Sequence, residues 1–187
     1  VDGMLNADPR YFDDAKLLNQ LSFAEAIELA YFGAKVIHPK TIQPLKEKNI
    51  SLRIKSFLNP KEEGTVIFED AEMEPFLPSF IIKENQILIS ISANDLSFIV
   101  EDHLSYIFSL LAKYGLGINM MQNSAVSFSV CVDNDSQKIL DLISELKEDF
   151  KVQYNDQLTL CTIRHYDQAA IDKVVDEKNI LLEQKSR

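Results

Sequence analysis

Residues 126–132 have the sequence Val-Ser-Phe-Ser-Val-Cys-Val, in which apolar side chains alternate with small or polar ones. Successive side chains of a strand point to opposite faces of a sheet, so this period of two predicts a strand with one buried face. Residues 87–91, Ile-Leu-Ile-Ser-Ile, predict a second strand. No apolar stretch approaches the roughly 18 residues that a membrane span needs.

Two helices are predicted around these strands. Residues 102–114 carry apolar side chains three, four and seven positions apart, and residues 136–148 repeat this spacing. Strands are expected at 116–121 and 151–154. The resulting order of strand, helix, two strands, helix and strand is that of the ferredoxin-like fold, an α+β arrangement with both helices on one face of an antiparallel sheet.

A second, incomplete round follows. We expect a strand at 158–163, a helix at 167–177 and a strand at 179–184. Either the earlier residues 80–83 complete this second sheet, or the natural chain continues beyond Arg187.

The first part of the chain has an α/β pattern. Ser22 and Glu25 form a capping box for a helix over 22–32, and Gly33 ends that helix. A second helix is expected at 39–48 and a strand at 51–57. The acidic segment 59–80 is interpreted as a linker with a short strand at 64–68. We expect His38 to be a buried structural histidine.

Composition and charge narrow the function. The chain has 187 residues and a formal net charge of −10. This charge disfavours nucleic acids and anionic membranes as partners. Cys131 and Cys161 lie in strand-like stretches without the spacing of metal ligands, so we interpret them as buried, reduced thiols and predict no metal site.

Three ordered segments carry a family resemblance. Residues 1–10 (V-D-G-M-L-N-A-D-P-R), 29–39 (L-A-Y-F-G-A-K-V-I-H-P) and 59–65 (N-P-K-E-E-G-T) resemble motifs of the aspartate kinases. Residues 121–130 are similar to the core of the family's first ACT module, an amino-acid-sensing domain. The resemblance implies the end of a three-layer amino-acid-kinase domain at 1–58, the linker at 59–80, a first ACT domain at 81–156 and a partial second one at 157–187.

The resemblance also implies an activity. Such enzymes transfer the γ-phosphoryl group of ATP-Mg to the side-chain carboxylate of L-aspartate. The positions that would line the nucleotide side of the site are Asp2, Gly3, Arg10, Lys35 and Val36. The catalytic residues are expected upstream of residue 1, so we expect this chain alone to be inactive. From the residues alone, Arg10 would simply pair with Asp13 or Asp14.

An effector site is implied as well. The positions that match the lysine-sensing pattern are Ser97, Val100, His103, Leu104, Ile118, Asn119, Ser124 and Ala125. Asn119 replaces an expected Asp, Ala125 an expected Glu and His103 an expected aromatic residue. The effector is therefore left open between lysine and threonine, with a degenerate site as a further alternative. His103 as a residue of the helix cap and Asn119 as a strand-edge residue remain the alternatives.

Family membership further implies a cytoplasmic homodimer that pairs through its ACT domains. The alternative is a non-catalytic ACT-type module for amino-acid sensing and dimerisation. A nucleic-acid-binding ferredoxin-like domain is disfavoured by the acidic charge. Whether a homoserine dehydrogenase domain follows is left open.

Overall fold

The computed structural model describes residues 2–34, 37–69, 71, 76–95 and 97–186. The chain divides into two compact units: unit 1 comprises residues 1–82 and 161–187, and unit 2 comprises residues 83–160. Two long strands, β4 (Ser79–Ala93) and β7 (Phe150–Arg164), each have residues in both units.

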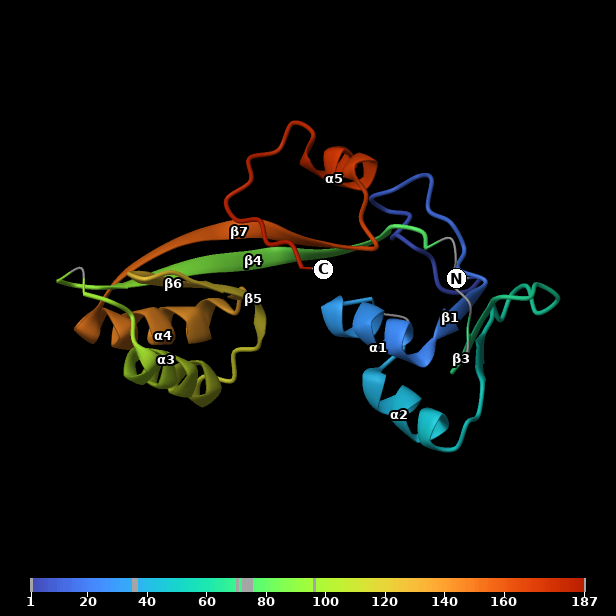
Figure 1. Cartoon of the computed structure of the whole chain (residues 1–187), viewed down its shortest axis with the longest axis horizontal. Helices are drawn as coiled ribbons and strands as arrows, with labels where there is room; N and C mark the ends of the chain where they lie inside the picture. The colour runs from blue at the N-terminus through green and yellow to red at the C-terminus, as the bar shows by residue number, and fades with distance from the viewer. Residues whose placement is uncertain (1, 35–36, 70, 72–75, 96, 187) are drawn as a thin grey trace. The chain divides into compact units, whose positions relative to one another are not determined.

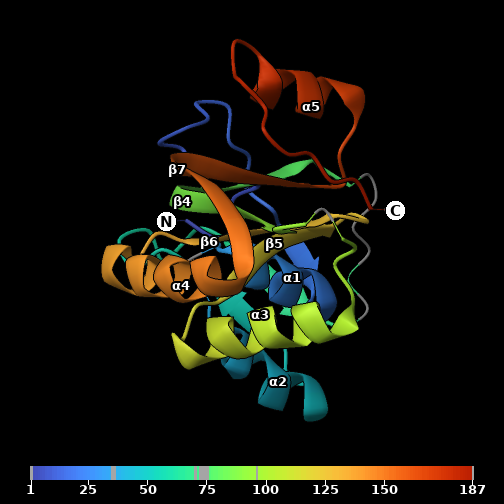
Figure 2. The same ribbon diagram turned by 90° about the vertical axis from the view of Figure 1, so that its left-hand side faces the viewer.

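Unit 2 contains a four-stranded sheet and two helices. Along the chain, β4 is followed by α3 (Glu101–Lys113), β5 (Ile118–Asn123), β6 (Ser127–Asp133), α4 (Ser136–Asp149) and β7. The strands lie side by side in the order β5-β6-β4-β7. Helices α3 and α4 cover the same face of this sheet (Figure 1, Figure 2). The predicted ferredoxin-like fold is therefore confirmed.

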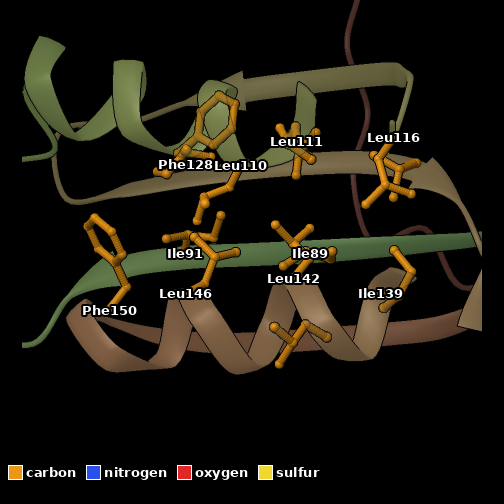
Figure 3. Packing of buried hydrophobic residues seen from close by; sticks show 14 of the residues in the cluster. Ile89, Ile91, Leu110, Leu111, Leu116, Phe128, Ile139, Leu142, Leu146 and Phe150 are labelled. Carbon is orange, nitrogen blue, oxygen red and sulfur yellow. The ribbon is translucent and has the colours of Figure 1, made fainter. Parts of the chain in front are cut away.

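The core of unit 2 follows from the strand register. Antiparallel pairing places Ile89 of β4 opposite Val130 of β6, and Ile91 opposite Phe128. All four side chains are buried against the helices. Figure 3 shows Leu110 of α3 and Leu146 of α4 reaching the same apolar layer. The alternating pattern of 126–132 thus forms one wall of this core.

The first part of unit 1 contains a three-stranded sheet and two helices. Its elements are β1 (Gln20–Ser22), α1 (Phe23–Phe32), α2 (Pro39–Glu47), β2 (Leu52–Ile54) and β3 (Thr65–Phe68). Strand β3 is central, parallel to β1 and antiparallel to β2. The Ser22 hydroxyl accepts a hydrogen bond from the Glu25 amide at 3.1 Å, and Gly33 ends α1 with φ of 119°. The predicted start and end of this helix are confirmed.

Several details of the sequence prediction are corrected. The strand expected at 51–57 is limited to β2, and it has a neighbour, because β3 from the expected linker pairs with it. Segments 151–154 and 158–163 form one strand, β7, and residues 80–83 belong to β4, its neighbour. Residues 179–184 form no strand in the described part of the chain.

His38 was expected to be buried, but it is exposed. Its Nδ1 accepts a hydrogen bond from the Lys40 amide at 3.2 Å and so caps the start of α2. A side chain that satisfies an unpaired amide of the first helical turn has to lie at the end of the helix, where water reaches it.

The end of β7 and the residues after it pack on the first part of unit 1. Arg164 donates two hydrogen bonds to the carboxylate of Glu25 on α1, at 2.7 and 2.8 Å, and a third to Glu28 at 3.2 Å. Helix α5 (Gln168–Val175) carries Lys173, whose ammonium lies 2.7 Å from an oxygen of Asp14. This ammonium also lies over the ring of Phe12. None of the described helices is long and apolar enough to cross a membrane.

The orientation of α4 can be tested with two leucines of the same helix. Leu142 is fully buried, whereas Leu140 is 59% exposed. Leu142→Ala should lower the free energy of unfolding by about 3 kcal/mol, because it leaves a cavity in the core. Leu140→Ala should change it by no more than about 0.5 kcal/mol. Urea denaturation followed by circular dichroism measures both, and equal effects would contradict the assigned face.

The pair of Arg164 and Glu25 should stabilise unit 1 in a pH-dependent way. Burial raises the pKa of Glu25, but the hydrogen bonds and charge of Arg164, with His165 nearby, outweigh it and hold the pKa below 4.5. The stabilisation is therefore complete above pH 4.5 and lost as the pH falls through the lowered pKa. Arg164→Ala should destabilise the protein by about 3 kcal/mol at pH 7, because it removes the guanidinium that pairs with the buried Glu25 carboxylate.

The matched control for this ion pair is Glu28→Gln, since the Glu28 carboxylate is 49% exposed. Its effect should stay within about 0.5 kcal/mol. Urea denaturation of each variant at pH 7 and at pH 3 gives the comparison. A destabilisation by Arg164→Ala that is as large at pH 3 as at pH 7 would show that the ion pair is not its cause.

Candidate functional site

Two of the three sequence motifs meet in unit 1 at Gly3 and Thr65. Thr65 is fully buried; its hydroxyl accepts a hydrogen bond from the Met4 amide at 2.7 Å and donates one to the Leu18 carbonyl at 2.6 Å. A Cβ atom on Gly3 would lie 2.6 Å from the Thr65 hydroxyl oxygen and 2.7 Å from Leu17. Only glycine fits this close approach. The neighbouring Asp2 is exposed.

Arg10 lies on an exposed turn in unit 1. Its side chain is 76% exposed, and one guanidinium nitrogen lies 2.6 Å from a carboxylate oxygen of Asp8. Hydrogen bonds from the side chain and backbone of Arg10 hold the pKa of Asp8 below its usual value. The partner is therefore Asp8 rather than the expected Asp13 or Asp14, and Asp14 pairs with Lys173 instead. The guanidinium is exposed to solvent, where an anion can reach it.

Lys35 and Val36, the remaining candidates for the nucleotide side, lie outside the described residues. The described chain leads up to them: the Ala34 amide donates to the Leu29 carbonyl at 2.9 Å, directly after Gly33 ends α1. Of the five predicted nucleotide residues, the structure thus places Gly3 against Thr65 and Arg10 on an accessible turn.

Unit 2 has an open groove of about 590 Å³ at the start of α3. It contains two predicted effector residues, Ser97 and His103. Three carboxylates, Asp95, Asp102 and Asp149, also line it. The His103 ring packs edge-on against Phe150, with 5.5 Å between ring centroids. The groove therefore combines negative charge with an aromatic wall.

The loop that forms this groove is held in place by polar contacts. The side-chain amide of Asn94 donates to the Asp149 carbonyl at 3.0 Å, and the Ser97 amide donates to Asp95 at 3.0 Å. Hydrogen bonds from Ser97 keep the pKa of Asp95 below its usual value. His103 Nδ1 accepts from the Val100 amide at 3.4 Å, so the alternative reading of His103 as a helix-cap residue describes its contact correctly.

The Val100 side chain cannot accept a hydrogen bond, so no side chain at the N-cap position satisfies the first amides of α3. Leu104, one turn along the helix, is half-buried and packs against the core. These first amides and the positive end of the helix dipole suit a carboxylate. The groove therefore has helix amides at one side and three carboxylates in its lining.

Ser124 and Ala125 lie near the same loop. The Ile99 amide donates to the Ala125 carbonyl at 2.9 Å, which ties the loop to the turn between β5 and β6. The Ser124 hydroxyl contacts the Ser127 hydroxyl at 2.8 Å within that turn. The structure therefore joins Ala125 to the loop before α3, although neither Ser124 nor Ala125 lines the groove.

Ile118 and Asn119 lie at the other end of β5. Ile118 pairs with Val132, which pairs with Ile87, whereas Asn123 pairs with Phe128 at the groove end. Ser124 lies five positions after Asn119 along the extended chain, which corresponds to roughly 16 Å. A single amino acid cannot span that distance, so the eight predicted effector residues form two groups at opposite ends of the strand.

Asn119 belongs to a polar cluster on the sheet face away from the helices. Its oxygen accepts from the Lys83 ammonium at 2.7 Å, and its amide nitrogen donates to Gln86 at 2.7 Å and Asp133 at 2.9 Å. Gln86 donates to the same Asp133 oxygen at 2.8 Å. Lys83, Gln86 and Asp133 were not among the residues predicted from the sequence. The polar side chain of Gln86, directly before the apolar stretch 87–91, was the feature that could have indicated this cluster.

Neither cysteine has the surroundings of a metal ligand or a reactive thiol. Burial raises the pKa of Cys131 to about 11 and that of Cys161 to about 11. Cys131 is buried as expected, whereas Cys161 is half-buried. Among the residues that the structure describes, no group of three His, Cys, Asp or Glu side chains is placed to hold a metal ion.

Comparisons with known proteins agree with these observations. The model of the amino acid kinase family matches residues 1–56. Aspartokinase 1 of Arabidopsis thaliana, a chloroplastic protein, is 36% identical over 134 residues, which are 71% of this chain and 23% of that protein. The chain spans well under half the length of the plant, bacterial and yeast relatives that it matches.

Two solved structures of E. coli aspartokinase III also match. The complex with lysine and aspartate, in the T-state, matches over 96% of this chain and 43% of that chain, with a TM-score of 0.78 and 26% identity. The complex with aspartate and ADP, in the R-state, matches over 87% of this chain and 38% of that chain, with a TM-score of 0.74 and 27% identity. The family model, the relatives and the solved structures together show that this chain belongs to the aspartokinases and corresponds to their C-terminal portion.

Proposed function

We propose that this chain is the regulatory part of an aspartate kinase, together with one side of its nucleotide site. The parent enzyme would transfer the γ-phosphoryl group of ATP to the side-chain carboxylate of L-aspartate. The observation that carries this proposal is the match over 96% of the chain to an aspartokinase solved with lysine and aspartate. The domain boundaries 1–58, 59–80, 81–156 and 157–187 belong to the same proposal.

On the nucleotide side, Arg10 is proposed to leave Asp8 and contact the phosphates, since its planar guanidinium offers several donors to an anion. Gly3 supports the proposal because its contact with Thr65 keeps the segment before Arg10 close to β3. Lys35 would add a second positive charge. Such cations stabilise the charge of the transferred phosphoryl group without covalent chemistry.

Mg²⁺ is proposed to arrive with the nucleotide, as ATP-Mg. The described residues contain no cluster of ligands for a metal ion, and Mg²⁺ is commonly held by one or two carboxylates and the substrate phosphates. We therefore assign no metal ligand to the residues that the structure describes.

Unit 2 is proposed to bind an amino-acid effector, either lysine or threonine. The groove at α3 would hold the backbone of the amino acid, with its carboxylate at the helix amides and its ammonium near the carboxylates. Asn119 and Ile118 are too far away to complete this site within one module. We therefore propose that the groove of one module and the Asn119 end of another form one site, in a homodimer that pairs through its ACT domains.

The effector signal has a physical route into unit 1. Strand β7 continues to Arg164, which holds Glu25 of α1, and α1 leads directly to Gly33 and the segment with Lys35. We propose the cytoplasm as the location of the parent enzyme, although the relatives include chloroplast proteins.

A non-catalytic module for sensing and dimerisation is the second candidate. It is favoured by the separate compact core of unit 2, which carries the groove at α3. The sequence of the full reading frame distinguishes the two candidates, because only an aspartate kinase would encode the rest of the catalytic domain.

The isolated chain should not catalyse aspartate-dependent formation of ADP from ATP, since most of the length of a catalytic relative lies outside it. A coupled assay for ADP, with and without L-aspartate, measures this. The full-length parent enzyme serves as the positive control. Turnover by the isolated chain that depends on aspartate would contradict the proposed division of the active site.

The effector proposal predicts ligand-induced stabilisation. An amino acid present at one hundred times its Kd should stabilise the chain by about 2.7 kcal/mol, visible as a raised Tm. His103→Ala should remove most of this shift, whereas Leu140→Ala, on the exposed side of α4, should keep it. If millimolar lysine and threonine both leave the Tm of the wild-type chain unchanged, unit 2 is not an effector domain for either.

A further inference from the structure

The side-chain amide of Asn119 has a fixed orientation. Residue 119 lies at an irregularity of β5, since Ile118 pairs with Val132 and Met120 already pairs with Cys131. The extra residue has no direct partner on β6, which is the arrangement of a β-bulge and redirects its side chain. Both hydrogens of the Asn119 amide nitrogen are then used, one on Gln86 and one on Asp133.

Gln86 reinforces this orientation. It is 1% exposed, and its own amide nitrogen donates to Asp133 and to the Glu84 carbonyl. Its oxygen accepts from Asn119 and from the Cys131 thiol. Rotating the Asn119 amide by half a turn would point its oxygen at the oxygens of Gln86 and Asp133. The oxygen of Asn119 is therefore held outward as an acceptor.

That outward oxygen is already occupied. The ammonium of Lys83, on β4, donates to it at 2.7 Å, and Lys83 is half-buried. The carboxylate of Asp133 contacts the same Asn119 side chain at its amide nitrogen. The cluster thus contains a built-in ammonium group at the position where the side chain of a bound amino acid would reach Asn119.

We propose that Lys83 sets the selectivity of the effector site, so that a neutral amino acid with a hydroxyl or amide side chain is accepted and one with a side-chain ammonium is excluded. This inference rests on the proposed effector function of Asn119. A hydroxyl or amide group of the ligand can donate a hydrogen bond to the Asn119 oxygen or accept one from the Lys83 ammonium. A second ammonium can only displace Lys83 or face its charge.

The size of the effect follows from electrostatics. Two like charges a few ångströms apart repel each other, and they do so several times more strongly near a protein surface than in bulk water. L-lysine should therefore bind the wild-type chain at least about tenfold more weakly than a neutral ligand of the accepted class. Removing the Lys83 charge leaves the negative charge of Asp133 in place and takes the ammonium away from the Asn119 oxygen, which favours a cationic ligand.

The experiment compares the wild-type chain with Lys83→Met, which keeps the length of the side chain and removes its charge. Lys83→Arg is the matched control that keeps the charge. Isothermal titration calorimetry measures the Kd of L-lysine, L-threonine and L-asparagine for each. Lys83→Met should bind L-lysine at least about tenfold more tightly than the wild type does. Its Kd for L-threonine or L-asparagine should change much less, and Lys83→Arg should behave as the wild type.

The outcomes separate the two proposals. If the wild type and Lys83→Met bind L-lysine equally well, the role of Lys83 is wrong while the effector function stands. If the wild type prefers L-lysine to both neutral ligands, the selectivity is likewise wrong. If no variant binds any of the three amino acids, both the proposed effector function of unit 2 and the proposed role of Lys83 are wrong. Urea denaturation checks folding, and Lys83→Gln replaces Lys83→Met if that variant does not fold.

Discussion

The antiparallel pairing of β4 with β6 is the constraint on which most of unit 2 depends. It sets Ile89 opposite Val130 and Gln86 opposite Asp133 in one continuous register. The first pair faces the helices and forms the core, while the second faces away and forms the polar cluster around Asn119. A slip of one residue would exchange the two faces, burying charge in the core and exposing isoleucine. The core and the candidate selectivity site are thus two consequences of one register.

Unit 1 depends on a different kind of contact. The buried hydroxyl of Thr65 joins Met4 and Leu18 through two hydrogen bonds, and the absence of a side chain on Gly3 lets these segments approach. This explains in physical terms why the first and third motifs of the family occur together in the sequence. They lie more than 60 positions apart along the chain and form one contact in the fold.

The ion pair of Arg164 with Glu25 links sequence positions that belong to different predicted domains. Glu25 was interpreted as a capping-box residue, and its backbone amide does bind Ser22. Its side chain, however, is committed to Arg164, which comes from the end of β7. The local pattern could place the start of α1 correctly, yet it could not show which distant cation would neutralise the buried carboxylate.

Local periodicity and capping signals were enough to predict the order of helices and strands in unit 2, because the spacing of apolar residues directly reflects which face is buried. The same signals predicted α1, α2 and the end of α1 at Gly33. They failed for His38, which was predicted to be buried but is exposed and accepts a hydrogen bond from the Lys40 amide. They also failed for residues 179–184, where an apolar pattern without a partner strand formed no sheet.

By itself, then, the sequence determined the order of the elements in unit 2, their buried faces and the family, since each of these is recorded in neighbouring residues. Tertiary structure decided what surrounds Asn119. Lys83, Gln86 and Asp133 come from two other strands, and a bulge in β5 directs the Asn119 side chain toward them. No local pattern records such a meeting, because it arises from strand order and register. The contact between the Lys83 ammonium and Asn119 could therefore be identified only in the folded chain.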